Sequence, residues 1–218
     1  MSDITFNGHS CFTIRTNSGQ TIVIDPFDPE TTGLKLPKLT ADLVLSTHSH
    51  PDHNFFKGVI GVTGEPFRVT GPGEYEVAGS LIHGINSYHD ESKGSERGRN
   101  TIYIINIEGV NICHMGDFGQ KKLTETQLED LGDVDILLIP VGGIFTIDAK
   151  DAIEVIAQIE PRMVVPMHYM EDSLKYDLGT LEEFIKQMGL LQVEPVKKIT
   201  AKKDRLPEEL QVMVMERA

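Results

Sequence analysis

The segment at residues 47–54, T-H-S-H-P-D-H-N, constrains this chain more than any other feature of its sequence. It follows directly on a short apolar run at 43–45, which is typical of a buried strand. The chain has 8 histidines in all, so three of them within six positions indicate a metal site at a strand end rather than a surface turn. The candidate ligands in this segment are His48, His50, Asp52 and His53.

The spacing within this segment predicts two neighbouring metal ions. In an extended segment His48 and His50 point to the same side of the chain, so both can reach one ion. Pro51 then redirects the chain, which lets Asp52 and His53 face a second ion nearby. Imidazole and carboxylate together suit divalent zinc, with manganese and iron as alternatives.

Apolar patterning and turn residues predict a mixed α/β fold. The first half is rich in strands, and the second half alternates strands with helices, which is a βαβ rhythm. Capping residues predict helices after Thr124, Asp148 and Thr180, with Pro161 and Gly189 ending the last two. We expect strands at 4–6, 11–15, 21–24, 43–45, 67–70, 80–85, 101–107, 110–113, 135–139, 163–166 and 210–215.

The bulk composition predicts one domain spanning residues 1–218. A chain of 218 residues builds a sufficient core without disulfides, so any metal is expected to be functional. Cys11 and Cys113 lie in apolar runs, which indicates buried free thiols. The chain opens directly into a strand pattern, without a signal peptide, and has no apolar run of membrane-span length. We therefore expect a cytoplasmic protein without a membrane partner.

The net charge of -13 bears on the partners of the chain. Such a charge argues against nucleic acid as a partner. It leaves room for a small anionic substrate, because a bound metal ion dominates the local field of its own site. The sequence leaves a homo-oligomer open.

The pattern H-x-H-x-D-H at 48–53 resembles the signature of the metallo-β-lactamase superfamily, and later motifs follow in the same order. The resemblance implies a single-domain, four-layered αββα sandwich. It also implies that His48, His50 and His89 hold one metal ion, that Asp52, His53 and His168 hold the other, and that Asp117 bridges the two. The supporting motifs are Ile24-Asp25-Pro26, His89-Asp90, Met115-Gly116-Asp117 and Pro166-Met167-His168-Tyr169. Asp25 is expected to orient the histidine segment without touching metal.

Four further histidines have to be weighed. His83 and His89 are alternative third ligands. His83 lies inside an apolar strand pattern, whereas His89 lies at a strand end beside another acidic residue, so we favour His89. His114 is expected either to pack in the core or to support a ligand from behind without touching metal. His9 lies at a turn, and the sequence leaves open whether it lines the cleft.

Further motifs are similar to the compact branch of the superfamily that includes the ascorbate-6-phosphate lactonase. These motifs are G-P-G-E-Y at 71–75, P-V-G-G at 140–143 and P-M-H-Y at 166–169. The same branch is similar to the phospholipase-D-type enzymes that cleave N-acyl phosphatidylethanolamine. Gly119-Gln120 departs from the branch, in which a histidine often stands at that place.

The predicted function is metal-dependent hydrolysis of a small ester, lactone or phosphorylated substrate by a metal-activated hydroxide. Asp52 and Asp117 are the candidate catalytic carboxylates, with Asp52 accepting a hydrogen bond from the nucleophile. The alternatives are a phosphodiesterase or nuclease and a non-catalytic metal-binding scaffold.

The loop 90–100 is the one segment that we expect to be mobile, because glycine and charged residues dominate it. It follows His89 directly. Closure of this loop would bring Arg97 or Arg99 over the site to pair with a substrate phosphate or carboxylate. The alternative is a solvated loop without that role.

Overall fold

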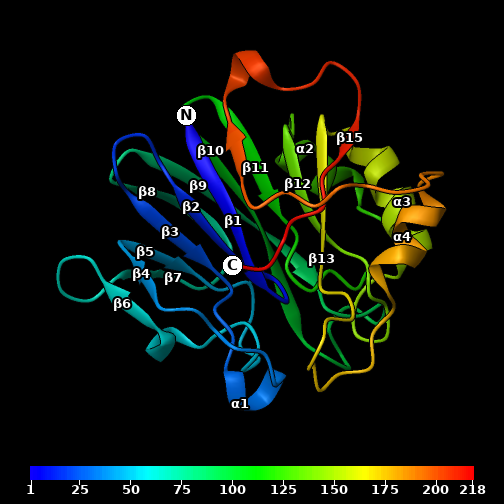
Figure 1. Cartoon of the computed structure of the whole chain (residues 1–218), viewed down its shortest axis with the longest axis horizontal. Helices are drawn as coiled ribbons and strands as arrows, with labels where there is room; N and C mark the ends of the chain where they lie inside the picture. Colours follow the sequence, from blue (N-terminus) through cyan, green and yellow to red (C-terminus); the bar gives the residue numbers. More distant parts are fainter.

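The computed structural model describes residues 1–218 as two β-sheets packed face to face, with helices outside them (Figure 1). The six-stranded sheet has the order β14 (Ile199–Ala201), β1 (Ser2–Gly8), β2 (Cys11–Arg15), β3 (Thr21–Ile24), β5 (Leu43–Leu45) and β7 (Phe67–Val69). The seven-stranded sheet has the order β15 (Gln211–Val212), β13 (Met163–Met167), β12 (Ile136–Pro140), β11 (Val110–His114), β10 (Arg99–Ile107), β9 (Ser80–Tyr88) and β8 (Gly73–Val77). A ribbon of β4 (Leu39–Ala41) and β6 (Val59–Gly61) stands apart.

Strand alternation places the main core between the two sheets. In β3, Ile22 and Ile24 belong to a cluster of 47 buried residues that draws on both sheets, because side chains two positions apart share a face. The intervening Val23 points the other way, into a smaller cluster of 10 residues. That second cluster includes Phe27 and Leu34 on either side of α1, so the outer face of the six-stranded sheet is also covered.

The helices complete the outer layers. They are α1 (Pro29–Thr32), α2 (Glu125–Leu131), α3 (Ala149–Ile159) and α4 (Leu181–Gln187), with short 3-10 turns η1 (Phe56–Gly58) and η2 (Lys203–Arg205). Thr124 and Thr180 form complete capping boxes, and Asp148 caps α3, as the sequence predicts. The predicted sandwich of two β-sheets with helices outside them is confirmed, with α3 and α4 side by side on the outer face of the seven-stranded sheet (Figure 1).

Several sequence-based assignments need correction. The strands β4, β6, β8 and β14 and helix α1 were not predicted; all are five residues or shorter, so their apolar period is too brief to detect. The final strand is only Gln211–Val212 rather than 210–215. Cys11 and Cys113 are buried free thiols, as expected. None of the helices has both the length and the apolar character needed to cross a membrane.

Candidate metal centre

The predicted site residues meet at one edge of the sandwich, where four strands reach their carboxyl ends. The loops that follow β5, β9, β11 and β13 carry them, and these loops come from both sheets. Rigid strands with polar loops at their ends are the usual scaffold of a site. The residues brought together there are His48, His50, Asp52, His53, His89, Asp117 and His168.

Asp117 lies at the centre of this cluster. Its Oδ1 atom is 3.1 Å from Nε2 of His53. Its Oδ2 atom is 3.1 Å from Nε2 of His89, 3.4 Å from Nε2 of His168 and 3.8 Å from Nε2 of His48. One carboxylate therefore faces four imidazole rings, which is the position that a bridging ligand needs.

The ligand atoms fall into groups that are compact enough for one ion each. His48, His50 and His89 offer nitrogen atoms within 4.8 Å of one another. A second group, held to the same distance, contains Asp52, His53, His168 and His9. His48, His53 and Asp117 form a third group, which joins the other two. Each group thus has the chemistry and spacing that a metal ion needs.

The side chains of the cluster also lack the hydrogen-bond partners that buried polar atoms normally have. His53 Nε2, Asp117 Oδ1, His89 Nδ1 and His168 Nδ1 are buried and form no hydrogen bond, although His53 Nε2 and Asp117 Oδ1 lie 3.1 Å apart. Orphaned buried polar atoms are costly unless something satisfies them. Cations bound among these nitrogen and oxygen atoms would supply the missing interactions, so the residues fit a divalent metal.

The electrostatics of the cluster favour a cation as well. Burial, followed by the charge of His53, lowers the pKa of His48 to about 3, so its ring is neutral and a lone pair is free. Burial opposes ionisation of Asp117, but His168 and His53 outweigh it and hold the pKa of Asp117 well below its usual range. Burial also opposes a charge on His53, yet Asp117, Asp52 and Asp25 raise its pKa well above the ordinary value. A field that retains a proton on a buried ring equally attracts a metal ion.

His9 is the residue whose role the sequence left open, and the structure places it inside the cluster. Its Nε2 lies 3.2 Å from Oδ2 of Asp52, and its ring centroid lies 4.3 Å from that of His168. The N–H of His168 donates to the carbonyl of His9 at 2.8 Å. The two residues have φ values of 56° and 52°, and such left-handed backbone in non-glycine residues is concentrated at functional sites.

Asp25 supports the histidine segment from below. Its Oδ1 accepts the N–H of Thr47 at 2.8 Å, and its Oδ2 accepts the Thr47 hydroxyl at 2.7 Å and lies 2.9 Å from Nδ1 of His53. The segment is not extended as the sequence analysis supposed. Residues 47–53 form bends and turns, with the N–H of His53 bonded to the carbonyl of His50. The rings of His48 and His50 are adjacent, with Nε2 of His48 3.1 Å from Nδ1 of His50.

Tyr103 ties this segment to the opposite sheet. It lies on β10, and its hydroxyl donates to the carbonyl of Ser46 at 3.0 Å. The same oxygen accepts the N–H of Gly71 at 2.8 Å. Tyr103 thus holds the loops after β5 and β7, and sequence reasoning missed it because a tyrosine within an apolar strand reads as core.

The loop that carries Asp117 depends on two close approaches. Asn100 Oδ1 accepts the N–H of Asp117 at 3.0 Å. Gly116 has φ +56°, and a Cβ atom there would lie 2.4 Å from that same Asn100 oxygen. A Cβ atom on Gly119 would lie 2.3 Å from the carbonyl carbon of His89. Glycine at position 119 therefore allows the two site loops to pack directly together.

Two histidines stay outside the cluster. His83 is half-buried on β9 opposite Glu74 of β8, far along the strand from the site. His114 is fully buried, with Nε2 2.9 Å from the carbonyl of Ser10 and Nδ1 accepting the N–H of Gly116 at 3.1 Å. Both nitrogens of His114 are occupied, so it packs beneath the site.

A cavity of about 330 Å³ opens beside the cluster. Beyond the cluster residues, its lining includes Arg97 and Glu96 from the loop after β9, Phe145 from the loop after β12, and Tyr176. Burial, with the charges of Asp52 and Asp117, raises the pKa of Tyr176 to about 12, so its phenol stays protonated. The cavity is large enough for a small molecule beside the candidate metal ligands.

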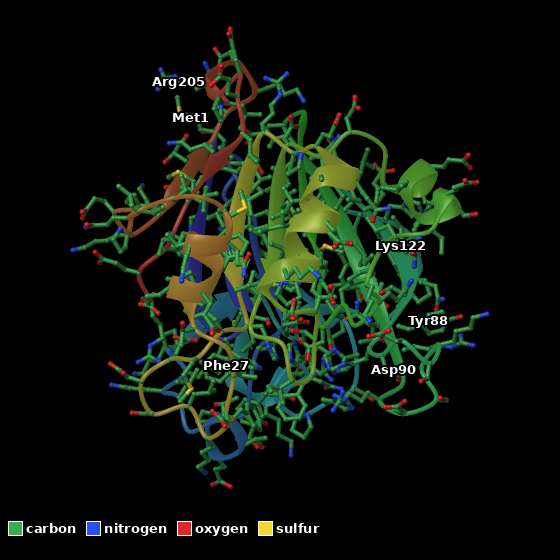
Figure 2. The ribbon with its side chains drawn as sticks, turned by 90° about the vertical axis from the view of Figure 1, so that its right-hand side faces the viewer. Met1, Phe27, Tyr88, Asp90, Lys122 and Arg205 are labelled. Carbon is green, nitrogen blue, oxygen red and sulfur yellow. The ribbon has the colours of Figure 1, made fainter.

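The loop after His89 is organised rather than loose. The Asp90 carboxylate accepts the backbone N–H groups of Gly94, Glu96 and Arg97 at 2.8, 3.1 and 2.8 Å. Figure 2 shows Tyr88 and Asp90 together at the edge from which this loop projects. Of the two arginines considered from sequence, Arg97 lines the cavity, whereas Arg99 lines a separate polar hollow behind Thr47 and His48.

The profile of the β-lactamase superfamily domain matches residues 3–168. A UPF0173 metal-dependent hydrolase of Thermococcus onnurineus is 33% identical over 198 residues, covering 78% of this chain and 85% of that protein. A UPF0173 metal-dependent hydrolase of Pyrococcus horikoshii is 30% identical over 199 residues, with the same coverage of both chains.

The fold is also similar to that of a solved structure from Thermotoga maritima, described as a Zn-dependent hydrolase of the metallo-β-lactamase superfamily. The two chains superpose with a TM-score of 0.79 at 35% identity, covering 99% of this chain and 98% of the other. The similarity therefore includes the final 50 residues, which the family profile does not reach.

Proposed function

Because the chain belongs to the metallo-β-lactamase superfamily and is a metal-dependent hydrolase of that superfamily, we propose that its centre holds two divalent ions, most simply zinc, and hydrolyses a small ester or lactone. The observation that carries the proposal is the cluster around Asp117, where one buried carboxylate faces four imidazoles. The whole chain, residues 1–218, would form the catalytic domain.

In this proposal the two ligand groups divide the ions between them. His48, His50 and His89 would hold the first ion. Asp52, His53 and His168 would hold the second, and Asp117 would be shared. His9 is close enough to the second group to compete for that ion, but its contact with Asp52 at 3.2 Å gives it another task, which is to hold that carboxylate in place.

The chemistry that divalent ions would supply when bound there is a hydroxide at neutral pH and polarisation of the bond that is attacked. The residues of the chain orient the other participants. Asp52 is half-buried at the cavity wall. Burial raises the pKa of its carboxyl, but the charge of His53 and the contact with His9 outweigh burial and hold that pKa below the usual range. An ionised Asp52 accepts a hydrogen bond from the attacking water and directs its lone pair toward the cavity.

The cavity argues for a small substrate. Its volume of about 330 Å³ is at the lower end of ligand sites. Arg97 is the only cationic side chain in its lining, whereas a nuclease needs a basic track for the phosphate backbone. We therefore place the protein with the compact, lactonase-like members rather than with the phosphodiesterases and nucleases. A purely structural role would leave the adjoining cavity unexplained.

Metal removal and replacement tests this function. The protein is stripped with a chelator, dialysed, and assayed against a panel of 4-nitrophenyl esters and simple lactones before and after addition of zinc or manganese. Activity that disappears on chelation and returns with metal supports the hydrolase. A metal-loaded protein that is folded but inactive on every ester and lactone, and active on bis(4-nitrophenyl) phosphate, would favour the phosphodiesterase alternative instead.

A further inference from the structure

We infer that Arg97 and Tyr176 form a pair of hydrogen-bond donors, positioned by Phe145, that selects substrates carrying a carboxylate or phosphate group beside the bond to be cleaved. The inference rests on the proposed hydrolysis at the adjacent metal centre. It assigns a specificity role to three residues from three separate loops.

The two donors face the cavity and have no partner within the protein. The Arg97 guanidinium forms no ion pair, and its only recorded interaction is with the Phe145 ring, whose centroid lies 5.2 Å from its central carbon. The Tyr176 hydroxyl forms no hydrogen bond, although the residue lines the same cavity. Donors left free at a cavity wall are available to a ligand, and charged donors bind anionic oxygen atoms most strongly.

Phe145 brings the two donors together. Its ring packs edge-on against the Tyr176 ring, with centroids 5.8 Å apart, while the Arg97 guanidinium lies over it. The Phe145 loop is itself closed by the N–H of Gly143 bonding to the carbonyl of Ile147 at 3.1 Å. An aromatic face holds a guanidinium through cation–π attraction and restricts its rotamers before a ligand arrives.

The Asp90 carboxylate fixes the other end of this arrangement. It accepts the Arg97 N–H at 2.8 Å and directly follows the candidate ligand His89. The donor pair is therefore tied to the metal centre through a short, organised loop. A substrate whose anionic group is bound there would have its scissile bond held at a fixed distance from that group and beside the metal centre.

Two other charged residues, Glu96 and Arg99, lie close to the donor pair along the chain but are not part of it. Glu96 also lines the cavity, but its carboxylate accepts the Ser92 hydroxyl at 2.7 Å along the loop surface. Arg99 lies only two residues from Arg97, yet it lines the separate hollow near Thr47 and Thr70. Arg99 is therefore a matched control, with the same charge two residues further along the chain, at the start of β10 and outside the cavity.

Two esters that differ in charge provide the test. The probes are neutral 4-nitrophenyl acetate and the anionic mono-4-nitrophenyl ester of succinic acid, assayed with metal-loaded enzyme. We expect the wild type to prefer the anionic ester, and Arg97→Gln to reduce that preference about 10-fold or more, mainly through KM. Tyr176→Phe should reduce it by about 3-fold to 10-fold. Arg99→Gln should leave it unchanged.

Two further variants separate the contributions of the charge, the shape and the position of the Arg97 guanidinium. Arg97→Lys retains the charge without the planar fork, so it should keep part of the preference if the variant is folded. Phe145→Leu should lower the preference without removing either donor. Competition by succinate and by inorganic phosphate, compared between wild type and Arg97→Gln, separates a carboxylate-selective pair from a phosphate-selective one. Equal effects of Arg97→Gln and Arg99→Gln, or a preference for the neutral ester, would overturn the inference.

Binding separates this inference from the proposed function. If neither ester is hydrolysed, titration calorimetry with monomethyl succinate still measures whether the cavity binds the anion. Binding that Arg97→Gln weakens by about 10-fold, and Arg99→Gln does not, would support the donor pair while the hydrolase proposal failed. No binding to wild type would overturn the donor pair.

Discussion

The Asp25 carboxylate lies 2.9 Å from Nδ1 of His53, and both side chains are 0% exposed. The same carboxylate accepts two hydrogen bonds from Thr47. It therefore fixes the orientation of one candidate ligand and the path of the segment that carries three others. A carboxylate behind a metal-binding histidine also sets which ring nitrogen is free for the metal.

Asp25→Asn should weaken zinc binding by about 10-fold to 100-fold, because the amide cannot match the charge behind His53. Competition titration with a fluorescent chelator measures this affinity. Asp28→Asn is the control, since Asp28 caps α1 through the N–H of Glu30 and touches no histidine. Equal zinc affinity in wild type and Asp25→Asn would show that Asp25 does not support metal binding.

Tyr103→Phe should lower the free energy of unfolding by about 1–3 kcal/mol, because the change leaves the Gly71 N–H and the Ser46 carbonyl without their partner. Urea unfolding of metal-free protein measures the loss independently of metal binding. Tyr88→Phe removes a hydroxyl that has no such partners and should stay within about 0.5 kcal/mol of wild type. If the two variants were equally stable, the connection through Tyr103 would contribute little.

Asp90 should make the order of the loop at 91–98 depend on pH. Burial opposes ionisation, but the N–H groups of Arg97, Gly94 and Glu96 outweigh it and lower the pKa of Asp90. A lowered folded-state pKa means that the stabilisation is complete above the unfolded value of about 3.9 and is lost as pH falls through the folded value.

Amide exchange protection at Gly94 and Arg97 should therefore be lower in Asp90→Asn than in wild type at neutral pH. The difference should begin to shrink as the pH falls below about 4, the unfolded value, and should vanish below the lowered pKa of the folded carboxylate. Mass spectrometry of exchange, corrected for the intrinsic rate at each pH, provides the measurement. A difference that grows toward acid pH would contradict this role of Asp90.

The sequence predicted those parts of the structure that depend on local pattern. The strands at Cys11–Arg15, Thr21–Ile24 and Leu43–Leu45 have the predicted bounds, since apolar alternation and turn residues determine them locally. The helix Glu125–Leu131 begins where it was predicted, directly after Thr124, because a capping box marks its start. Elements of three to five residues, such as β4 and β8, carry too short a pattern to be recognised.

The surroundings of the site could not be predicted in the same way. Tyr103 and Asn100 reach the site loops only because β10 lies against β9 and β11, and such pairing is set by packing across the whole sandwich. The position of His9 likewise depends on the contact between its turn and the loop after β13. The sequence also could not show that Arg97 rather than Arg99 lines the cavity. That placement depends on the hydrogen bonds of the Asp90 carboxylate within the loop, and residue spacing does not reveal them.

Metal content tests the central claim most directly. Inductively coupled plasma mass spectrometry on gently purified wild type should find about two equivalents of divalent metal per chain. Asp117→Ala and His168→Ala should each lose metal, whereas His83→Ala, which changes a histidine outside the cluster, should keep it. Less than about one equivalent in wild type, unchanged in Asp117→Ala and His168→Ala, would contradict the binuclear centre.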